Sequence, residues 1–483
     1  MDLQLSQILV FVGLTALIAA VTIWVCARAG TSRDSEKEYF LAGGGLKWYF
    51  VAGSITLTNL STDQLVGMNG NQMALLAWWE LAAVVGLIML CFVFIPVYYK
   101  YQCTTTTELL ERRYNNKHIR ALISILFLAG NIFIFLPAIL YGGSLFMQQM
   151  FGIESVNIYY IAIAFAVVGS AYAIFGGLRA VAVSDTFSGI LLLCLALLVV
   201  WVALKAINFD FSDIPIERLS MIGSYDSPIP FATLFTGMLF IQMFYWSTNQ
   251  TITQRAMASP SVKEAQKGIL AAAGIRLLIV PPIIVIPGII SYKLYGDIGD
   301  AAYGRIVGDL LPGFLSGAFA AAIAAAVLTT FNSILNASAA LWVCDIHETY
   351  IKKDPNIKRL SFWVSIVMVL LAFIMFPVFQ NSESLINKVQ EFYGYLSMPI
   401  LSAFIVGLLF KNVNANAVII GVIFGVALYA FFLNVWPTLP GGNYIHMMAV
   451  TLISSICVSL FLNRFLFGQK AKWDAHEVFS KRP

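Results

Sequence analysis

The stretch from Val51 to Met73 is apolar at both ends and polar in its middle, reading VAGSITLTNLSTDQLVGMNGNQM. Its middle carries hydroxyl, amide and carboxyl side chains, namely those of Thr56, Thr58, Asn59, Ser61, Thr62, Asp63 and Gln64. Lipid offers no hydrogen bonds, so a segment this polar at membrane depth must face protein, water or a ligand. A helix that unwinds here would release carbonyl oxygens for ions and solutes. The alternative is an intact helix whose hydroxyls bond to the preceding turn.

The composition excludes a soluble globular protein. Of the 483 residues, 59% are hydrophobic, 14% aromatic and only 11% charged, which is typical of a polytopic membrane protein. The net charge of +4 is small and no basic patch with interleaved aromatics is present, so we expect no nucleic-acid partner. No obligate protein partner is evident from the sequence. Six cysteines lie singly without CxxC spacing, which favours buried thiols over disulfides or a metal cluster: Cys26, Cys91, Cys103, Cys194, Cys344 and Cys457.

Apolar runs long enough to cross a bilayer, which takes about 20 residues each, recur along the whole chain. Thirteen lie near 7–27, 49–71, 74–99, 120–147, 155–175, 183–205, 231–255, 267–294, 313–346, 360–379, 385–410, 416–435 and 446–467. The first run lacks a basic leader and a small-residue cleavage site, so we expect a retained helix rather than a signal peptide. The chain is therefore predicted to be an all-α integral membrane protein with one transmembrane domain over residues 1–483.

Lys and Arg alternate between the loops and predict the orientation. The amino end has no basic residue, whereas the next loop carries Arg28, Arg33, Lys37 and Lys47. Basic loops recur on alternate connections up to the tail at 468–483. Loops that weaken the pattern carry Lys205, Arg218, Lys293 and Arg305 beside acidic residues. By the positive-inside rule we expect a multi-pass protein of the cell inner (plasma) membrane, with the N-terminus outside and the C-terminus cytoplasmic.

A second apolar run also turns polar partway. The long loop at 208–230 divides the spans into two groups, and the next span, 231–255, becomes polar from Tyr245 to Gln254. Two interrupted helices in corresponding positions of two halves indicate an inverted-repeat transporter with its site between them. The alternative is that polar residues near a helix end are simply leaving the membrane.

Several long, uncommon strings in this order resemble the sodium/solute symporter family, and within it the sodium-glucose cotransporter branch. They are EYFLAGGGLKWYFVAGSI (38–55), TNLSTDQLVGMNG (58–70), FGGLRAVAVSDTFSG (175–189), YWSTNQTITQR (245–255), SVKEAQKGI (261–269) and FNSILNASAALWVCDI (331–346). The resemblance implies a LeuT-type core of two inverted five-helix repeats, 49–205 and 231–410. A leading helix, 7–27, two trailing helices, 416–467, and a cytoplasmic tail, 468–483, complete the expected layout.

The resemblance also implies a sodium site where the unwound first core helix meets the eighth. The matching ligands are the carbonyls of Leu57, Leu60 and Ala326 with the hydroxyls of Thr329 and Thr330. A hard cation prefers several oxygen ligands, which unwound carbonyls and two hydroxyls supply. The family more often has serines at the two threonine positions, so we expect a retained site with altered affinity.

Some relatives hold a second sodium ion nearer the cytoplasm. The matching residues are Asp185, Thr329, Asn332 and Ser333, of which the last three share one helix face by the i, i+3, i+4 rule. Asn332 departs from the family pattern, which has a hydroxyl there. For Asp185 the alternative is an acid that only caps the start of a helix.

For the solute, the positions that match the branch combine polar groups with aromatic faces, as sugar sites do. They are Asn59, Gln64, Glu80, Gln242, Tyr245, Trp246, Arg276 and Gln390. Glu80 matches only if the loop before it is shortened, Gln242 replaces an asparagine and Arg276 replaces a lysine. Tyr245 and Trp246 have the alternative of packing or interface anchors. Arg276 lies inside an apolar run, where it pairs with Glu80, contacts the solute or snorkels to the cytoplasmic side.

These features predict a sodium-coupled secondary active symporter that imports a small polyhydroxylated solute, such as glucose or galactose, by alternating access. Na+ is the expected coupling ion, and the solute and lipid bilayer are the expected partners. The alternative solutes are inositol, sialic acid or another carboxylate, and an amino acid; the run FLAGNIFIFLPAILYGG lacks the arginine expected of a sialic acid transporter. The chain is not expected to be an enzyme or a sensor, because it has no HExxH, P-loop or GxSxG string and no signalling domain after Phe467.

Overall fold

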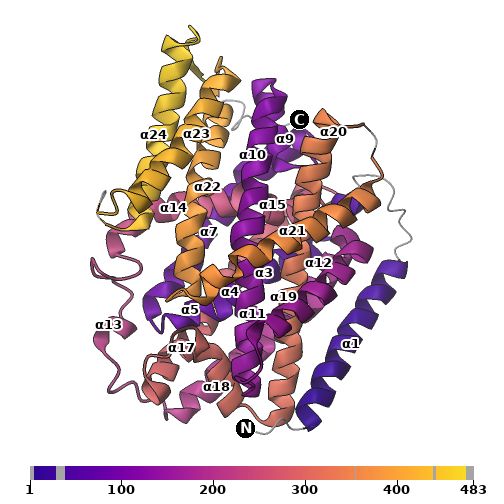
Figure 1. Cartoon of the computed structure of the whole chain (residues 1–483), viewed down its shortest axis with the longest axis vertical. Coiled ribbons are helices and arrows are strands. Elements are labelled where there is room, and N and C mark those ends of the chain that lie inside the picture. Colours follow the sequence, from indigo (N-terminus) through magenta and orange to yellow (C-terminus); the bar gives the residue numbers. More distant parts are fainter. Residues whose placement is uncertain (1–4, 29–38, 354, 439–441, 475–483) are drawn as a thin grey trace.

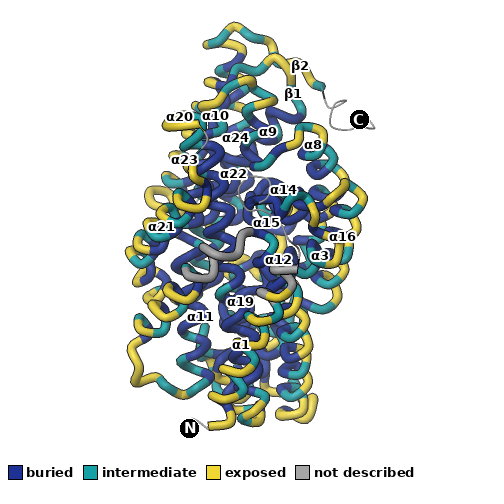
Figure 2. The backbone as a smooth tube through the Cα atoms, turned by 90° about the vertical axis from the view of Figure 1, so that its right-hand side faces the viewer, coloured by how far each residue is buried: buried dark blue, intermediate teal, exposed yellow. Residues whose placement is uncertain are grey.

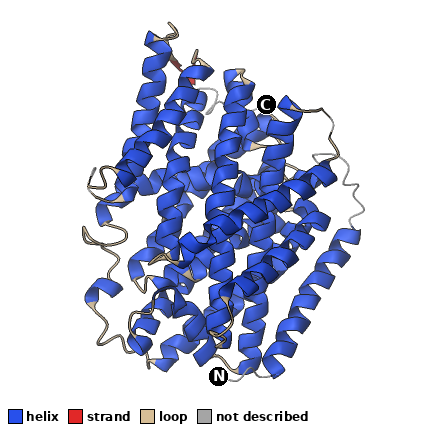
Figure 3. Cartoon of the chain, viewed as in Figure 1, coloured by secondary structure: helices blue, strands red, loops and turns tan. Residues whose placement is uncertain are grey.

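The computed structural model describes residues 5–28, 39–353, 355–438 and 442–474, without the side chains at 22, 23, 25–28 and 171–177. This part of the chain is almost entirely helical (Figure 3). One short exception is the antiparallel pair of β1 (Phe410–Lys411) and β2 (Lys472–Trp473).

The helices before residue 207 include the predicted leading helix, α1, and those of the first predicted repeat. They are α1 (Leu5–Arg28), η1 (Ala42–Gly44), α3 (Trp48–Asn59), α4 (Thr62–Leu65), α5 (Gly67–Gly70), η2 (Ala74–Ala77), α6 (Trp78–Leu81), α7 (Ala83–Met89), η3 (Leu90–Phe94), α8 (Ile95–Lys100), α9 (Thr106–Tyr114), α10 (Lys117–Gly130), η4 (Asn131–Phe135), α11 (Leu136–Phe151) and α12 (Ile158–Ala206).

The helices after residue 207 carry the second predicted repeat and the trailing pair. They are α13 (Ile216–Leu219), η5 (Phe231–Phe235), α14 (Gly237–Ser247), α15 (Gln250–Met257), α16 (Val262–Leu278), α17 (Val280–Tyr295), η6 (Gly299–Ala301), α18 (Ala302–Leu310), α19 (Gly313–Ala340), η7 (Leu341–His347), α20 (Glu348–Tyr350), α21 (Ile357–Gln380), α22 (Leu385–Leu409), α23 (Ala415–Asn434) and α24 (Tyr444–Phe465).

Helix α19 is the packing centre of the molecule. It contacts α1, α3, α11, α12, α15 and α21, and nearly every residue from Ser316 to Ala340 is buried. The run AAAIAAAV at 320–327 explains this position, because small side chains let neighbouring helices approach closely. On the periphery, α23 and α24 pack on each other and on α22, while α1 lies at the other side (Figure 1).

The outer surface is apolar, as a lipid-facing surface requires. Large hydrophobic side chains such as Ile163, Val167, Leu370 and Ile453 are exposed on the helices, and Figure 2 shows the buried residues in the interior. Among the described residues, nine helices are long and apolar enough to span a membrane. The protein is a multi-pass membrane protein, and the number of thirteen crossings stays a prediction.

The two polar stretches do interrupt their helices. Between α3 and α4, Leu60 (φ −77°, ψ 71°) and Ser61 (φ −113°, ψ −171°) leave the helical conformation. Between α14 and α15, Asn249 is extended and its side chain accepts a hydrogen bond from Thr251 N. Helix α15 packs against α3, so the two interrupted helices adjoin. The intact-helix alternative for the Val51–Met73 stretch is therefore wrong.

Two predictions are corrected by the structure. The predicted spans 155–175 and 183–205 belong to one helix, α12, of 49 residues, because the glycines between them lower helix propensity without removing a backbone hydrogen bond. The predicted burial of the cysteines fails for Cys194 and Cys457, which are exposed on outward faces. The side chains of Cys91, Cys103 and Cys344 are buried as predicted, and the Cys26 side chain lies outside the described residues.

Candidate functional site

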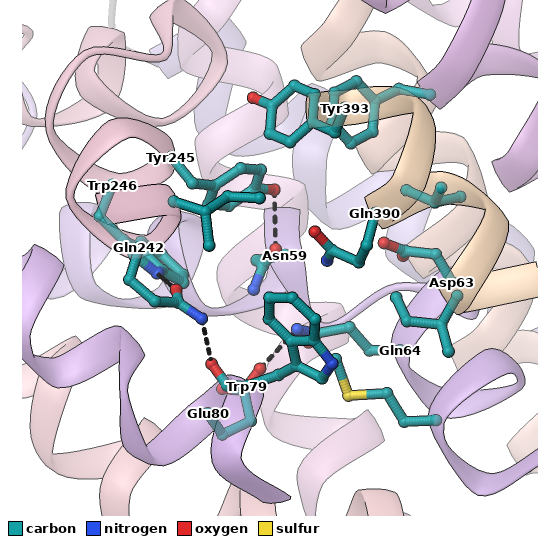
Figure 4. A pocket seen from close by; sticks show the side chains of 15 residues that line it. Asn59, Asp63, Gln64, Trp79, Glu80, Gln242, Tyr245, Trp246, Gln390 and Tyr393 are labelled. Atoms are coloured by element: carbon teal, nitrogen blue, oxygen red, sulfur yellow. Dashed lines mark hydrogen bonds between the residues drawn. The ribbon is translucent and has the colours of Figure 1, made fainter. Parts of the chain in front are cut away.

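A pocket with a cavity volume of about 30 Å³ lies beside the break between α3 and α4 (Figure 4). A cavity of this size holds little more than one water molecule, so its walls must move apart before a sugar fits between them. The pocket brings together most of the predicted solute-binding residues, namely Asn59, Gln64, Glu80, Gln242, Tyr245, Trp246 and Gln390. They come from four separate parts of the chain, and Arg276 lies behind the pocket lining rather than in it.

A closed polar cluster forms one wall of the pocket. The Arg276 guanidinium pairs with Glu80 at 2.7 Å between Nη2 and Oε2, and the two side chains are 0% and 1% exposed. Gln64 joins both partners, since its Nε2 donates to Glu80 and its Oε1 accepts from Arg276 at 3.0 Å. Arg276 Nη1 also donates to the Thr56 carbonyl at 3.1 Å, at the end of α3. Of the three alternatives for Arg276, pairing with Glu80 is the one that the structure adopts, and burial excludes snorkelling.

Trp246 and Gln242 form a second wall. Trp246 Nε1 donates to Gln242 Oε1 at 2.9 Å, and Gln242 Nε2 donates to the Trp79 carbonyl at 2.7 Å. A Cβ atom at Gly86 would lie 2.3 Å from the Gln242 carbonyl oxygen, so glycine is what lets α7 and α14 touch at this point. The Arg276 guanidinium lies 4.6 Å from the Trp246 ring centroid, a cation–π distance that ties this wall to the polar cluster.

Tyr245 closes the pocket toward a second, smaller space. Its hydroxyl donates to Asn59 Oδ1 at 2.7 Å, which links α14 to the end of α3. Its ring packs edge-on against Tyr393 of α22, whose hydroxyl accepts from Asn249 Nδ2 at 2.9 Å. Tyr245 therefore connects the two interrupted helices, and its hydrogen bond to Asn59 would break if these helices moved apart.

Two polar side chains that face the pocket are left without a partner. Within the described part of the chain, the Gln390 side chain makes no hydrogen bond, and the Asp63 carboxylate makes no hydrogen bond or ion pair to another side chain. Figure 4 places the two near each other. Trp79 adds a buried indole N–H without a partner. The sequence analysis did not assign Asp63, Trp79 or Tyr393 to the site. The signal for Asp63 was its place within the polar stretch, between Asn59 and Gln64.

The helices that carry the predicted sodium ligands adjoin where α19 passes the break. Helices α3 and α4 both pack against α19, and Thr330 Oγ1 donates to the Thr58 carbonyl at 3.3 Å. Thr329 Oγ1 donates to the Ala326 carbonyl at 3.2 Å. The hydrogen bonds of the described residues include none to the carbonyls of Leu57 or Leu60. Free carbonyls beside two hydroxyls fit the oxygen preference of a hard cation.

Asp185 lies inside α12 and not at its start, so the helix-cap alternative is wrong. Its carboxylate accepts from Ser54 at 2.5 Å and from Thr58 at 3.3 Å, and the Thr329 hydroxyl also faces it. Arg255 donates to Ser54 Oγ at 2.9 Å, so a buried positive charge stands one hydroxyl away from the acid. Asp185 Oδ1 is buried without a hydrogen-bond partner.

Asn332 and Ser333 complete the predicted second sodium set on α19. Both are fully buried, but Ser333 Oγ donates to the Thr329 carbonyl of its own helix. The Asn332 amide has neither its oxygen nor its nitrogen in a hydrogen bond. Buried amides are rarely left unpaired, so Asn332 and Asp185 Oδ1 fit a site that an ion or water fills.

Comparison with known proteins places the chain in one family, by matches that cover most of its length. The model of the "Sodium:solute symporter family" matches residues 39–425. An uncharacterized symporter, YidK, of Escherichia coli (strain K12) is 33% identical over 94% of this chain and 83% of its own length. The sodium/glucose cotransporter of Vibrio parahaemolyticus is 29% identical over 95% of this chain and 90% of its own length. The mouse sodium/myo-inositol cotransporter 2 is 27% identical over 88% of this chain and 70% of its own length.

Solved structures support the same architecture. A Na+-coupled sialic acid symporter in a substrate-bound outward-open state aligns with a TM-score of 0.82 at 18% identity, covering 98% of this chain and 100% of that one. MhsT in complex with L-phenylalanine aligns with a TM-score of 0.53 at 14% identity, covering 86% and 98%. At these identities the likeness shows the fold alone, which is the LeuT type.

Proposed function

Because the chain belongs to the sodium:solute symporter family, we propose that it imports a small polyhydroxylated solute, a hexose such as glucose or galactose, together with Na+ by alternating access. It is a transporter and not an enzyme. The relative named for glucose and the polar, aromatic-walled pocket support a sugar. We further propose that it lies in the cell inner membrane with its N-terminus outside.

One observation carries the coupling. The break after α3 adjoins α19 and leaves the main-chain oxygens of Leu57 and Leu60 without a hydrogen bond among the described residues, and it places the side chains of Asn59 and Gln64 at the pocket. The same few residues therefore serve the proposed ion site and the proposed solute site. A sodium ion that fixes this segment also fixes the pocket wall, so ion binding raises solute affinity, and the coupling is reciprocal.

The proposed sodium ligands are the carbonyls of Leu57, Leu60 and Ala326 and the hydroxyls of Thr329 and Thr330. We also propose a second sodium ion held by Asp185, Asn332 and Ser333, with Thr329 shared, because Asp185 and Asn332 each keep a buried oxygen without a hydrogen-bond partner. One charge moving inward through 100 mV yields about 2.3 kcal/mol. A tenfold sodium gradient adds about 1.4 kcal/mol per ion, so one ion sustains a solute ratio in the hundreds.

Uptake into proteoliposomes tests this function. We expect an inward sodium gradient to drive concentrative uptake of labelled glucose or galactose, and a potassium gradient of the same size to drive none. Inositol, supported by the relative named for myo-inositol, is the second solute to examine, and N-acetylneuraminate and amino acids complete the panel. Uptake that is equal in sodium and potassium would contradict sodium coupling, and uptake of the amino acids alone would contradict a polyhydroxylated solute.

A further inference from the structure

The solute pocket carries an acidic charge that the protein does not balance. Its lining residues include two carboxyl groups, those of Asp63 and Glu80. Glu80 is neutralised by Arg276 at 2.7 Å, in a pair with both side chains buried. Asp63 has no cationic side chain in an ion pair with it among the described residues. The pocket wall is therefore negative by one charge when Asp63 is ionised.

The unpaired carboxyl group faces the space that a solute would fill. Asp63 stands next to Gln64 at the start of α4 and opposite Gln390 of α22 in Figure 4. Gln390 is also without a hydrogen-bond partner in the described part of the protein. The other polar groups of the wall are already joined to one another, as with Gln64 and Glu80. Asp63 and Gln390, together with the Trp79 indole N–H, thus have free capacity for a bound molecule.

A carboxylate held away from bulk water is costly unless a cation or several hydrogen-bond donors accompany it. Solute hydroxyls supply donors, and a solute ammonium group supplies a counter-charge as well. A solute carboxylate would instead place a like charge beside Asp63, and no free cation lines the pocket to offset that repulsion. The negative charge of the pocket wall thus distinguishes three classes of solute built on the same sugar ring: neutral sugars, amino sugars and sugar carboxylates.

Resting on the proposed function, we propose that Asp63 selects the solute by charge, so that the pocket favours a hydroxylated ring with an amino group, accepts a neutral hexose and rejects a carboxylate. The amino sugar is the preferred class. Its ammonium group pairs with Asp63, and a ring hydroxyl meets Gln390. Arg276 takes no part in solute charge recognition, because Glu80 neutralises its charge and its side chain lies behind the pocket lining.

A cation bound on the side of Asp63 away from the solute pocket would be an alternative source of counter-charge. A smaller space beyond Tyr245 is lined by Asp63 together with Thr58, Thr251 and Thr330. A sodium ion bound there would neutralise Asp63 and leave the solute pocket uncharged. The tests below distinguish this outcome from selection by the solute.

The first test uses glucosamine, glucose and glucuronate as competitors of sodium-driven uptake, at a pH where the amine is protonated. In the wild-type protein we expect glucosamine to bind at least as tightly as glucose, and glucuronate not to compete. In Asp63→Asn we expect glucosamine to bind at least tenfold more weakly, the affinity for glucose to change less than threefold, and glucuronate to compete.

The control is Asp210→Asn, which removes a carboxylate from an exposed loop. An equal loss for glucosamine and glucose, or a lower Hill coefficient for sodium, would overturn the proposal.

The second test needs no solute, so it separates failure of this inference from failure of the proposed function. A cysteine at position 390, in a protein without its native cysteines, reacts with cationic and anionic methanethiosulfonate reagents of similar size at pH 8. We expect the cationic reagent to react faster than the anionic one, with a rate ratio at least tenfold higher than the same ratio measured on a free thiol. Asp63→Asn should remove that preference. An unchanged ratio in Asp63→Asn would overturn the inference even if hexoses are transported. A changed ratio together with no hexose uptake would keep the charged wall and refute the hexose.

Discussion

Arg276 and Glu80 lie 196 positions apart in the chain and form an ion pair within the core, with 2.7 Å between Nη2 and Oε2. The pair stands on the wall of the pocket and reaches α3 through the Thr56 carbonyl. It thus connects α16, α6 and the interrupted helix in one cluster. A charge pair this deep is strongly destabilising to break, because the remaining partner is left buried and uncompensated.

The first prediction concerns this pair. Glu80→Gln and Arg276→Lys are both expected to lower stability, and Arg276→Ala is expected to cost about 3–5 kcal/mol because it leaves Glu80 unpaired. Joint replacement, Arg276→Met with Glu80→Gln, should recover much of that loss while transport stays impaired. Detergent thermal shifts and uptake measure the two effects separately. If Arg276→Lys impairs transport far more than Glu80→Gln at equal stability, Arg276 contacts an anionic solute instead.

The second prediction separates solute contacts from wall contacts. Gln390→Ala should weaken hexose affinity tenfold or more, which is about 1.4 kcal/mol, with little change in stability, because Gln390 has no partner in the described protein. Gln64→Ala and Glu80→Ala should weaken affinity similarly but also lower stability, because each leaves Arg276 unsatisfied.

Gln380→Ala is the control, since Gln380 is exposed at the end of α21. Affinity is measured as the concentration for half-maximal sodium-driven uptake. Normal hexose transport by the three alanine variants would refute the assignment of the solute site.

The third prediction concerns the proposed first sodium site. Thr329→Ala with Thr330→Ala should weaken sodium affinity by tenfold or more, because two of about five oxygen ligands are lost. Thr330→Ser keeps the oxygen and is expected to remain active, which makes it the matched control. The sodium concentration for half-maximal uptake is the measurement. An unchanged value in the double variant, in a protein that is folded and inserted, would show that the ion binds elsewhere.

The fourth prediction concerns the number of sodium ions. Asp185→Asn should reduce the Hill coefficient for sodium from about two towards one and reduce the charge moved per solute, because the carboxylate no longer offsets the second cation. Asp210→Asn, on an exposed loop, should change neither. Charge and solute fluxes measured together in proteoliposomes give the ratio. A wild-type ratio of one charge per neutral solute would rule the second ion out.

The fifth prediction is the topology. A cysteine in place of Ser227, on the long loop between the two halves, should react with a membrane-impermeant maleimide in sealed right-side-out cells. A cysteine in place of Glu36, which lies outside the described residues, should react only after the membrane is opened. Both are introduced into a protein without its native cysteines. Strong labelling at position 36 in sealed cells would reverse the orientation.

The sequence by itself determined the class of protein and the two places where its helices are interrupted. Polar side chains such as Thr58 and Asn249 within apolar runs mark these places, because lipid cannot satisfy their hydrogen bonds. Six long strings that match the family likewise identified it, and the comparisons confirm this. The sequence pattern did not predict that α12 runs unbroken through 158–206. The glycines suggested a break, but glycine only lowers helix propensity and does not prevent a helix.

Only the tertiary structure decided which polar groups satisfy one another. Arg276 had three alternatives in the sequence, and packing of α16 beside α6 and α3 selected Glu80 as its partner. The same packing left Asp63 and Gln390 unpaired at the pocket. Whether a polar side chain has a hydrogen-bond partner depends on residues distant in the chain, and a local sequence pattern does not show which of these lie close in space. That is why Asp63 stood in the polar stretch of the sequence yet was recognised as part of the site only in the folded protein.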